Sequence, residues 1–491
     1  MGLKLVLGNS FLYSVANVLQ GAVSFILLPV YTRYLEPKEY AILALVVSFS
    51  GILSSIITFQ IQAGIPRYVI KFIKDKERAV EYFSSIFIFL FLIVAIICGI
   101  VTIFGEKIIK IMFSDKDQIV YYPYFLIATW ALLPNLLVSS GLSLVQTLEK
   151  GKSFFLISLV QTVINVILAL FFVIYLKTGI FGILMAQLLS YVFSFIMLIW
   201  FIRDWLKLVM PKFSKDVVDS LKYSLPIIPH MLSIYIYMYS DRLILQRYVP
   251  LSDIGIYSIA GTFAYVLLVI VNSTTAAYSP RFLKLAEENA DKARSETNRF
   301  IEFWWMMVLV ILAGYFFLSG FVVRFMTTAK YYLCIPLIPI LASAYIFRGL
   351  YCFAAGSLFH KERTQFIPVI SFSAAIVNVI INIIFIPKFG IFAAAWSTVV
   401  SYGVTFALSY YFSRKIFPIF FPWAKMQKSA YLLLALIVLT KLFTGIFRVN
   451  LATDLSVNML MFVLFSLIVF FVLNKEYSRK AMEIVFGYLR F

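Results

Sequence analysis

Apolar runs of about twenty residues recur along the whole chain, and they constrain its fold more than any other feature. A helix needs about 20 mostly apolar residues to cross a bilayer. With Pro, Gly and charged residues as boundaries, fourteen such runs can be read in the 491 residues. Hydrophobic residues make up 62% of the chain and charged residues 13%, whereas soluble domains carry about 25% charged residues. The sequence therefore predicts an all-α integral membrane protein with about 14 transmembrane helices.

The first run is expected to stay in the protein as a helix. It carries polar Asn17 and Gln20 and has no small-residue cleavage pattern, unlike a removed signal peptide. The fourteen predicted spans are centred near Val23, Gly51, Leu92, Leu133, Val166, Leu189, Ile234, Leu267, Leu312, Ala344, Val377, Val400, Leu436 and Phe465.

Positive charge is unevenly distributed between alternate loops. Two thirds of the 42 Lys and Arg residues fall in the set of loops that includes the N-terminus. This bias is typical of cytoplasmic loops, so both termini are predicted to be cytoplasmic. The net charge of +19 is interpreted as a topology signal and as attraction to anionic headgroups. No groove-reading motif is present, so nucleic acid is not expected as a partner.

Part of the sequence is an internal repeat. RYLEPKEYAILALVVSF begins at Arg33, and RYVPLSDIGIYSIAGTF begins at Arg247. KTGIFGILMAQLLSY from Lys177 likewise resembles KFGIFAAAWSTVVSY from Lys388. The repeat is about 210 residues long and holds six spans, so both copies should have the same orientation about an axis along the membrane normal.

The repeat predicts three parts. Residues 1–210 form an N-terminal six-helix lobe, residues 211–420 form a C-terminal six-helix lobe, and residues 421–491 add two transmembrane helices and a cytoplasmic tail. Transporters place the substrate near the bilayer midplane, between such repeats. This arrangement favours a transporter before any motif is considered.

Few charged residues lie inside the predicted spans, where an isolated charge costs about 2.5–3.5 kcal/mol. Asp241 and Arg242 are adjacent and point about 100° apart on a helix, so each is expected to find a partner elsewhere. Arg242 either meets an anionic headgroup or joins a structural pair, and Asp241 either orients a basic group or accepts a proton. Arg348 either clamps phosphate oxygens or snorkels or pairs with a carboxylate.

Other polar residues carry a softer signal. His230 directly follows Pro229 on the Asp241 helix and either titrates near neutral pH or packs through a hydrogen bond. Arg33 is interpreted first as an interface anchor. The amides either hold helices together or bond sugar hydroxyls, and they include Asn135, Gln187, Asn378 and Asn382. The aromatic residues are expected mostly in lipid-facing or interfacial belts, and the alternative for Tyr235, Tyr237 and Tyr239 is a stacking surface for sugars.

Two passages resemble a known family. SFLYSVANVLQGAVSFILLPVYTRYLEPKEYAILAL, from Ser10, and SDRLILQRYVPLSDIGIYSIA, from Ser240, are similar to polysaccharide-transporter flippases (Wzx-type) of the MOP superfamily. The resemblance implies the MATE-like fold of two six-helix lobes. It also implies transport of polyprenyl-pyrophosphate-linked oligosaccharide across the cytoplasmic membrane of a prokaryote, for O-antigen or other surface polysaccharide biosynthesis.

The resemblance assigns roles to individual residues. Arg348, Arg242 and Arg33 would contact the substrate headgroup, and Asp241, with His230, would serve gating or ion coupling. Membrane lipids, glycosyltransferases and a polysaccharide polymerase are the implied partners. No cofactor and no metal site are expected, because two histidines and the three cysteines Cys98, Cys334 and Cys352 make no ligand set.

Two other functions stay open at this stage. A multidrug or cation antiporter of the same fold would use cavity carboxylates, and only Asp241 is a convincing internal acid. A membrane polysaccharide polymerase or ligase would need a sizeable outer loop, whereas the longest predicted connections lie on the cytoplasmic side. We therefore expect a transporter and not an enzyme.

Overall fold

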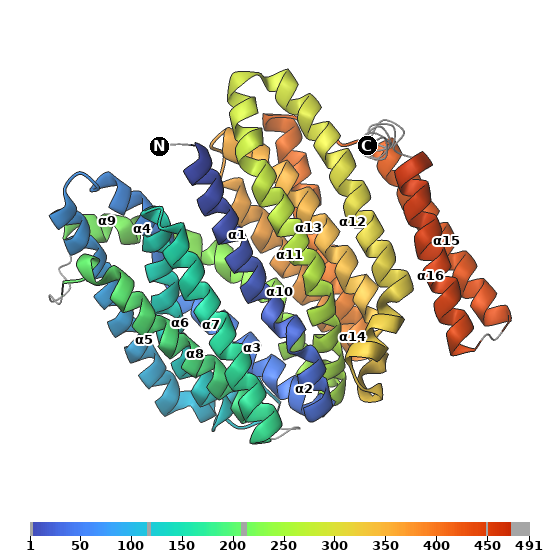
Figure 1. The fold of residues 1–491 in the computed structure, drawn as a ribbon, viewed down its shortest axis with the longest axis horizontal. Helices are drawn as coiled ribbons and strands as arrows, with labels where there is room; N and C mark the ends of the chain where they lie inside the picture. The colour runs from blue at the N-terminus through green and yellow to red at the C-terminus, as the bar shows by residue number, and fades with distance from the viewer. Residues whose placement is uncertain (1–2, 115–118, 208–213, 448–449, 473–491) are drawn as a thin grey trace, which may run out of the picture. The chain divides into compact units, whose positions relative to one another are not determined.

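The computed structural model describes residues 3–114, 119–207, 214–447 and 450–472. Helices make up nearly all of these residues, and no strand occurs among them (Figure 1). The predicted all-α membrane fold is confirmed. The α-helices are α1 (Leu3–Ile26), α2 (Leu28–Tyr34), α3 (Pro37–Ile57), α4 (Ile61–Lys71), α5 (Lys76–Met112), α6 (Tyr124–Thr147), α7 (Gly151–Leu170), α8 (Gly179–Ile202), α9 (Lys215–Ser224), α10 (Ile228–Tyr248), α11 (Leu251–Glu288), α12 (Ala290–Met326), α13 (Leu337–His360), α14 (Phe366–Ile416), α15 (Trp423–Ile446) and α16 (Leu451–Leu467).

Twelve helical segments of the described chain are long and apolar enough to cross a membrane. Two features account for the difference from fourteen predicted spans. The spans expected near Val377 and Val400 are two helical segments that meet at a kink at Gly390, where φ is 55°, and both lie within α14. Helix α10 contains the span expected near Ile234, but its tyrosines, Asp241 and Arg242 lower its mean hydropathy.

The chain divides into two compact units. One contains Met1–Ile259 and Ser371–Ser401, and the other contains Ala260–Ile370 and Tyr402–Phe491. The lobe boundaries predicted near residues 210 and 420 stay predictions. The predicted cytoplasmic tail, residues 473–491, lies outside the described residues.

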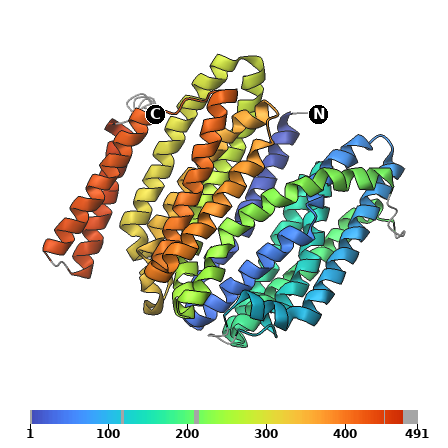
Figure 2. The ribbon, with the colours of Figure 1, turned by 180° about the vertical axis from the view of Figure 1, so that it is seen from behind.

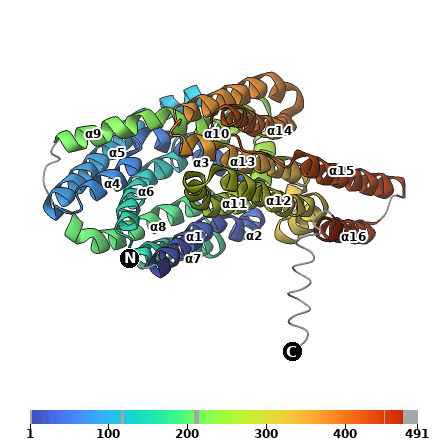
Figure 3. The same cartoon turned by 90° about the horizontal axis from the view of Figure 1, so that it is seen from above.

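Within the first unit, α8 packs against α6 and α7, α1 packs against α7, and α3 packs against α10 (Figure 1). A core of large apolar side chains, including Phe83 on α5, Leu136 on α6 and Leu198 on α8, joins helices of this unit. Helix α9 leads into α10 through a short 3-10 turn, Leu225–Ile227, that contains Pro226 (Figure 3). Proline cannot donate a backbone hydrogen bond, which explains the break between the two helices.

Within the second unit, α12 packs against α13, α15 and α16. The last two helices also pack on each other, as the reverse view shows in red (Figure 2). These two helices correspond to the appended pair of spans predicted after the repeat.

The two copies of the repeated passage are in contact where α3 begins in the first copy and α11 begins in the second. In the first copy, Pro37 starts α3, and the Glu39 carboxylate accepts a hydrogen bond from the Glu36 backbone N–H at 2.8 Å. This capping box fixes where α3 begins. In the second copy, Gly255 lies in the first turns of α11, and a Cβ there would overlap the Pro37 carbonyl oxygen. Only a glycine allows the two backbones to approach this closely.

We predict that Gly255→Ala destabilises the protein by about 1–3 kcal/mol or more, because the added methyl meets backbone that cannot rotate away. Thermal unfolding in detergent measures the effect. Gly99→Ala is the matched control, since a Cβ at that membrane-spanning position meets nothing within 4 Å. A Gly255→Ala variant as stable as the Gly99→Ala variant would contradict the close approach.

Candidate functional site

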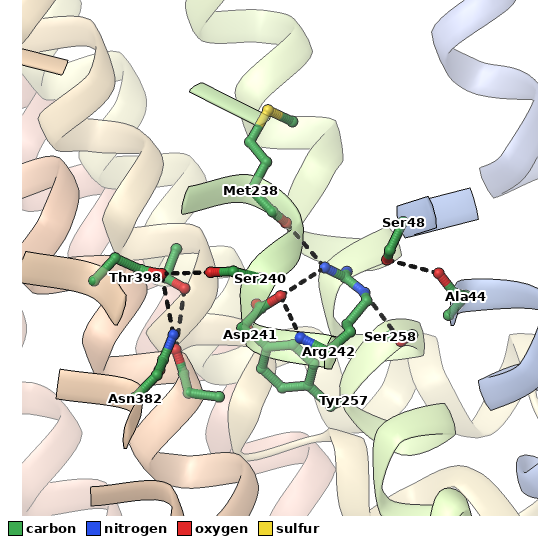
Figure 4. Close-up of polar contacts among 12 residues, drawn as sticks. Ala44, Ser48, Met238, Ser240, Asp241, Arg242, Tyr257, Ser258, Asn382 and Thr398 are labelled. Carbon is green, nitrogen blue, oxygen red and sulfur yellow. Dashed lines mark hydrogen bonds and ion pairs between the residues drawn. The ribbon is translucent and has the colours of Figure 1, made fainter. Parts of the chain in front are cut away.

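The polar residues of the DR…GIYS motif form one cluster, which we call the motif cluster: Asp241, Arg242, Tyr257 and Ser258. Helix α10 supplies the first two and the start of α11 supplies the others (Figure 4). The Asp241 side chain is 4% exposed and the Arg242 side chain is 17% exposed. Two formal charges are therefore largely withdrawn from solvent on a helix predicted to span the membrane.

Three donors converge on the Asp241 carboxylate. The Arg242 backbone N–H donates to Oδ1 at 2.7 Å, and Arg242 Nη1 donates to the same oxygen at 3.2 Å. The Tyr257 hydroxyl donates to Oδ2. Hydrogen bonds and an opposite charge together offset the cost of removing a carboxylate from water.

The Arg242 guanidinium binds both helices. Its Nη1 donates to the Met238 carbonyl at 3.0 Å, one turn earlier on α10, and its Nε donates to Ser258 Oγ at 3.3 Å on α11. Its Cζ lies 5.5 Å from the centroid of the Tyr257 ring and 6.0 Å from that of Tyr239. The guanidinium therefore ties the end of α10 to the start of α11.

Asp241 and Arg242 form an ion pair with each other, although each was expected to find its partner elsewhere. The 100° separation applies to their Cβ directions, but the long arginine stem folds back and brings Nη1 within 3.2 Å of the carboxylate. Each residue also has the partner on another helix that the sequence predicted. The paired charges sum to zero, so the motif cluster presents less positive charge than Arg242 alone would.

A second polar network lies beside the motif cluster. Ser240 Oγ donates to Asn378 Oδ1 at 3.2 Å, and Asn382 Nδ2 donates to the same oxygen at 3.0 Å. Ser397 Oγ donates to Asn382 Oδ1. All four side chains are buried. Between the two interpretations of these amides, the bonds fit the one in which they hold helices together.

The remaining predicted site residues are His230, Arg33 and Arg348. His230 Nδ1 is hydrogen-bonded to Ser371 Oγ at 2.8 Å, which fits a packing role. Arg33 is exposed in the last turn of α2. Arg348 is half-buried on α13 in the second unit, with its Cζ 5.0 Å from the Tyr351 ring centroid. No group of three or more potential metal ligands occurs among the described residues.

Sequence reasoning missed Tyr257 and Ser258. They lie 16 positions after Asp241 and Arg242, across the turn between two helices, so helical periodicity does not connect them. The available signal was the quoted passage from Ser240, because it contains both polar pairs, Asp241-Arg242 and Tyr257-Ser258.

Solved structures of transporters share this fold. The lipid II flippase MurJ, in an inward closed conformation, is 16% identical to this chain, with a TM-score of 0.74. The superposition covers 97% of this chain and 100% of the MurJ chain. An inward-facing multidrug resistance transporter of the MATE family is 14% identical, with 80% and 94% coverage and a TM-score of 0.72. A MOP superfamily transporter from Pyrococcus furiosus is 15% identical, with 83% and 95% coverage and a TM-score of 0.59.

The chain therefore shares the fold of these transporters of known structure. The chain belongs to the polysaccharide biosynthesis protein family, whose model matches residues 6–286. The matched range includes both quoted passages and the whole motif cluster. No curated protein matches the sequence.

We predict that breaking the Asp241–Arg242 pair destabilises the protein more than losing both charges does. Arg242→Gln should cost about 3 kcal/mol, because it leaves a carboxylate buried without its cation. The double variant Asp241→Asn/Arg242→Gln should cost less than the sum of the single variants. Denaturant unfolding in detergent measures this cycle.

The exposed pair Arg281–Glu296, at 2.7 Å with side chains 67% and 27% exposed, provides the control. Its disruption should cost no more than about 1 kcal/mol. Equal costs at the two sites, or strictly additive effects at Asp241 and Arg242, would contradict the structural importance of the motif cluster.

Proposed function

We propose that this protein moves polyprenyl-pyrophosphate-linked oligosaccharide units across the cytoplasmic membrane of a prokaryote by alternating access. One combination of observations supports the proposal. This chain belongs to a polysaccharide biosynthesis family, and its long apolar helices have a fold like that of a transporter of known structure. Among proteins of this fold, the MurJ structure is that of a lipid II flippase. Glycosyltransferases that build the unit and a polymerase that consumes it are the proposed partners.

The physical problem that this function solves is a charge barrier. A pyrophosphate with a sugar chain cannot cross about 30 Å of hydrocarbon without a polar path. We assign Arg348 the leading contact with the pyrophosphate, because guanidinium groups bind phosphate oxygens through paired hydrogen bonds. Arg33, at the end of α2, would meet the headgroup at the membrane surface.

Arg242 and Asp241 have a conditional role in this proposal. With Asp241 charged, the carboxylate holds the guanidinium. Protonation of Asp241 would weaken that hold and release positive charge toward the headgroup. Asp241 would thus serve as the gating or ion-coupling residue, and His230, on the same helix, would support it. The transfer breaks no covalent bond, so we propose a transporter without a cofactor and not an enzyme.

A multidrug or cation antiporter is the second candidate, because a MATE-family transporter has a similar fold. The purified protein should bind undecaprenyl pyrophosphate and should not bind ethidium. Affinity for ethidium together with none for the polyprenyl pyrophosphate would favour the antiporter. A polymerase or ligase would instead change the length of a sugar chain in vitro.

We predict that Arg348→Ala abolishes export of surface polysaccharide while the protein still inserts in the membrane. Polymer at the cell surface and protein in the membrane fraction are measured together. Arg324→Ala is the control, because Arg324 is another half-buried arginine near a tyrosine, 5.7 Å from the Tyr332 ring centroid. Normal export by Arg348→Ala would remove this residue from the cargo site.

We predict that the α11–α12 connection is cytoplasmic and the α12–α13 connection is external. In a cysteine-free background, Glu288→Cys should react with a membrane-impermeant maleimide only after cells are permeabilised. Leu333→Cys, at a position 68% exposed, should react in intact cells. The proposed orientation places both termini in the cytoplasm, and the reverse labelling pattern would overturn it.

A further inference from the structure

A pocket of about 230 Å³ lies within the first unit, among α3, α6, α8 and α10. Its polar lining comes from all four helices and includes Ser50, Asn135, Gln187, Tyr235 and Tyr239. None of the described residues that line it is charged. The motif cluster lies next to it, because the Tyr239 ring that lines the pocket has the Arg242 guanidinium 6.0 Å from its centroid.

Two polar side chains of the pocket lack protein partners. Ser50 Oγ is buried and has no hydrogen-bond partner, and the Asn135 amide makes no hydrogen bond to any described residue. Gln187 Nε2 donates to the Tyr191 hydroxyl at 3.0 Å, which orients the Gln187 amide. For the buried Ser50 hydroxyl, the lack of a partner costs about 1–3 kcal/mol, whereas the Asn135 side chain is half-buried. Water or ligand hydroxyls inside the pocket would satisfy these groups.

The pocket also has an aromatic wall. The Tyr235 and Tyr239 rings are stacked, with centroids 5.8 Å apart and planes 23° apart. Gly51 on α3 makes room for this wall, because a Cβ there would lie 2.8 Å from Tyr239 Cε2. The pocket therefore combines a flat apolar surface with neutral donors and acceptors.

This chemistry discriminates among ligands. A phosphate would require cationic groups in the lining, and a carboxylate there would favour a drug cation. The described lining contains no cationic group and no carboxylate. An aromatic ring attracts a cation through its face, but the Tyr239 ring already has the Arg242 guanidinium 6.0 Å from its centroid. A sugar ring has apolar C–H faces and hydroxyls that both donate and accept, so it matches both parts of the lining.

The size of the pocket sets how much of a sugar chain it can hold. Drug-sized ligands occupy clefts of roughly 300–1,000 Å³, and this volume is smaller. We propose that the pocket is a binding subsite for a single uncharged sugar ring of the lipid-linked cargo. The inference rests on the proposed function and adds to it: the arginines bind the pyrophosphate, while Tyr239, Asn135 and Ser50 recognise one sugar.

The first experiment measures binding of free sugars to purified protein in detergent by saturation-transfer NMR. The probes are glucose, galactose, N-acetylglucosamine and rhamnose. We expect at least one to bind with an affinity on the order of millimolar. Asn135→Leu removes an amide without a protein partner, and Gly51→Ala displaces Tyr239 without removing a lining polar group. Each should weaken binding about tenfold.

The control variant is Tyr175→Leu. Tyr175 is also stacked on an aromatic ring, that of Phe171 at 5.5 Å, but is 77% exposed and lies outside the pocket. It should bind sugars as the unsubstituted protein does. Equal loss in the control, or no effect of both pocket substitutions, overturns the subsite.

The second experiment separates failure of the subsite from failure of the proposed function. Liposomes containing the protein are given bare undecaprenyl pyrophosphate or the same lipid carrying the sugar that binds. Asn135→Leu and Gly51→Ala should slow only the sugar-bearing lipid, whereas Arg348→Ala should slow both.

If the pocket variants flip both lipids normally, the subsite is overturned and the flippase stands. In another outcome, the protein flips neither lipid but binds tetraphenylphosphonium, and Gly51→Ala weakens that binding. This outcome overturns both the subsite and the flippase. If no sugar of the panel binds while the bare lipid is flipped, the subsite alone is overturned.

Discussion

Pairing of Asp241 with Arg242 is the constraint on which the local structure of this protein depends. An isolated charge near the centre of a spanning helix costs about 2.5–3.5 kcal/mol, and here two occur side by side on α10. Their mutual ion pair, the Tyr257 hydroxyl and Ser258 offset that cost. Because two of these partners belong to α11, satisfying the charges also fixes how α10 meets the next helix. The same guanidinium faces Tyr239, whose ring lines the neighbouring pocket.

The spans were predictable from sequence because each must be apolar over nearly its whole length. The difference between fourteen predicted spans and twelve long apolar segments has physical causes. The two spans expected on either side of Gly390, which has a positive φ, meet within α14, and polar residues lower the hydropathy of α10 below that of its neighbours. The site was less predictable. Tyr239, Asn135 and Gln187 were each visible as polar residues in apolar runs, but only packing of α3, α6, α8 and α10 brings them together.

The fold by itself does not determine the cargo. MATE transporters and MurJ resemble this chain at similar TM-scores and similarly low identity. What distinguishes the possible cargoes is the chemistry of the polar groups inside the helices. Here Asp241 is committed to Arg242 and Tyr257, so it is less available to a cationic substrate than an unpaired carboxylate would be. The neutral pocket beside it adds recognition that depends on shape and hydroxyl groups instead of charge.

The contact between Gly255 and the Pro37 carbonyl bears on the history of the duplication. After a gene segment doubles, its copies normally drift apart independently. At this contact the backbone of the first copy leaves no room for a side chain at position 255 of the second copy. One copy of the passage therefore limits which residues the other copy can accept.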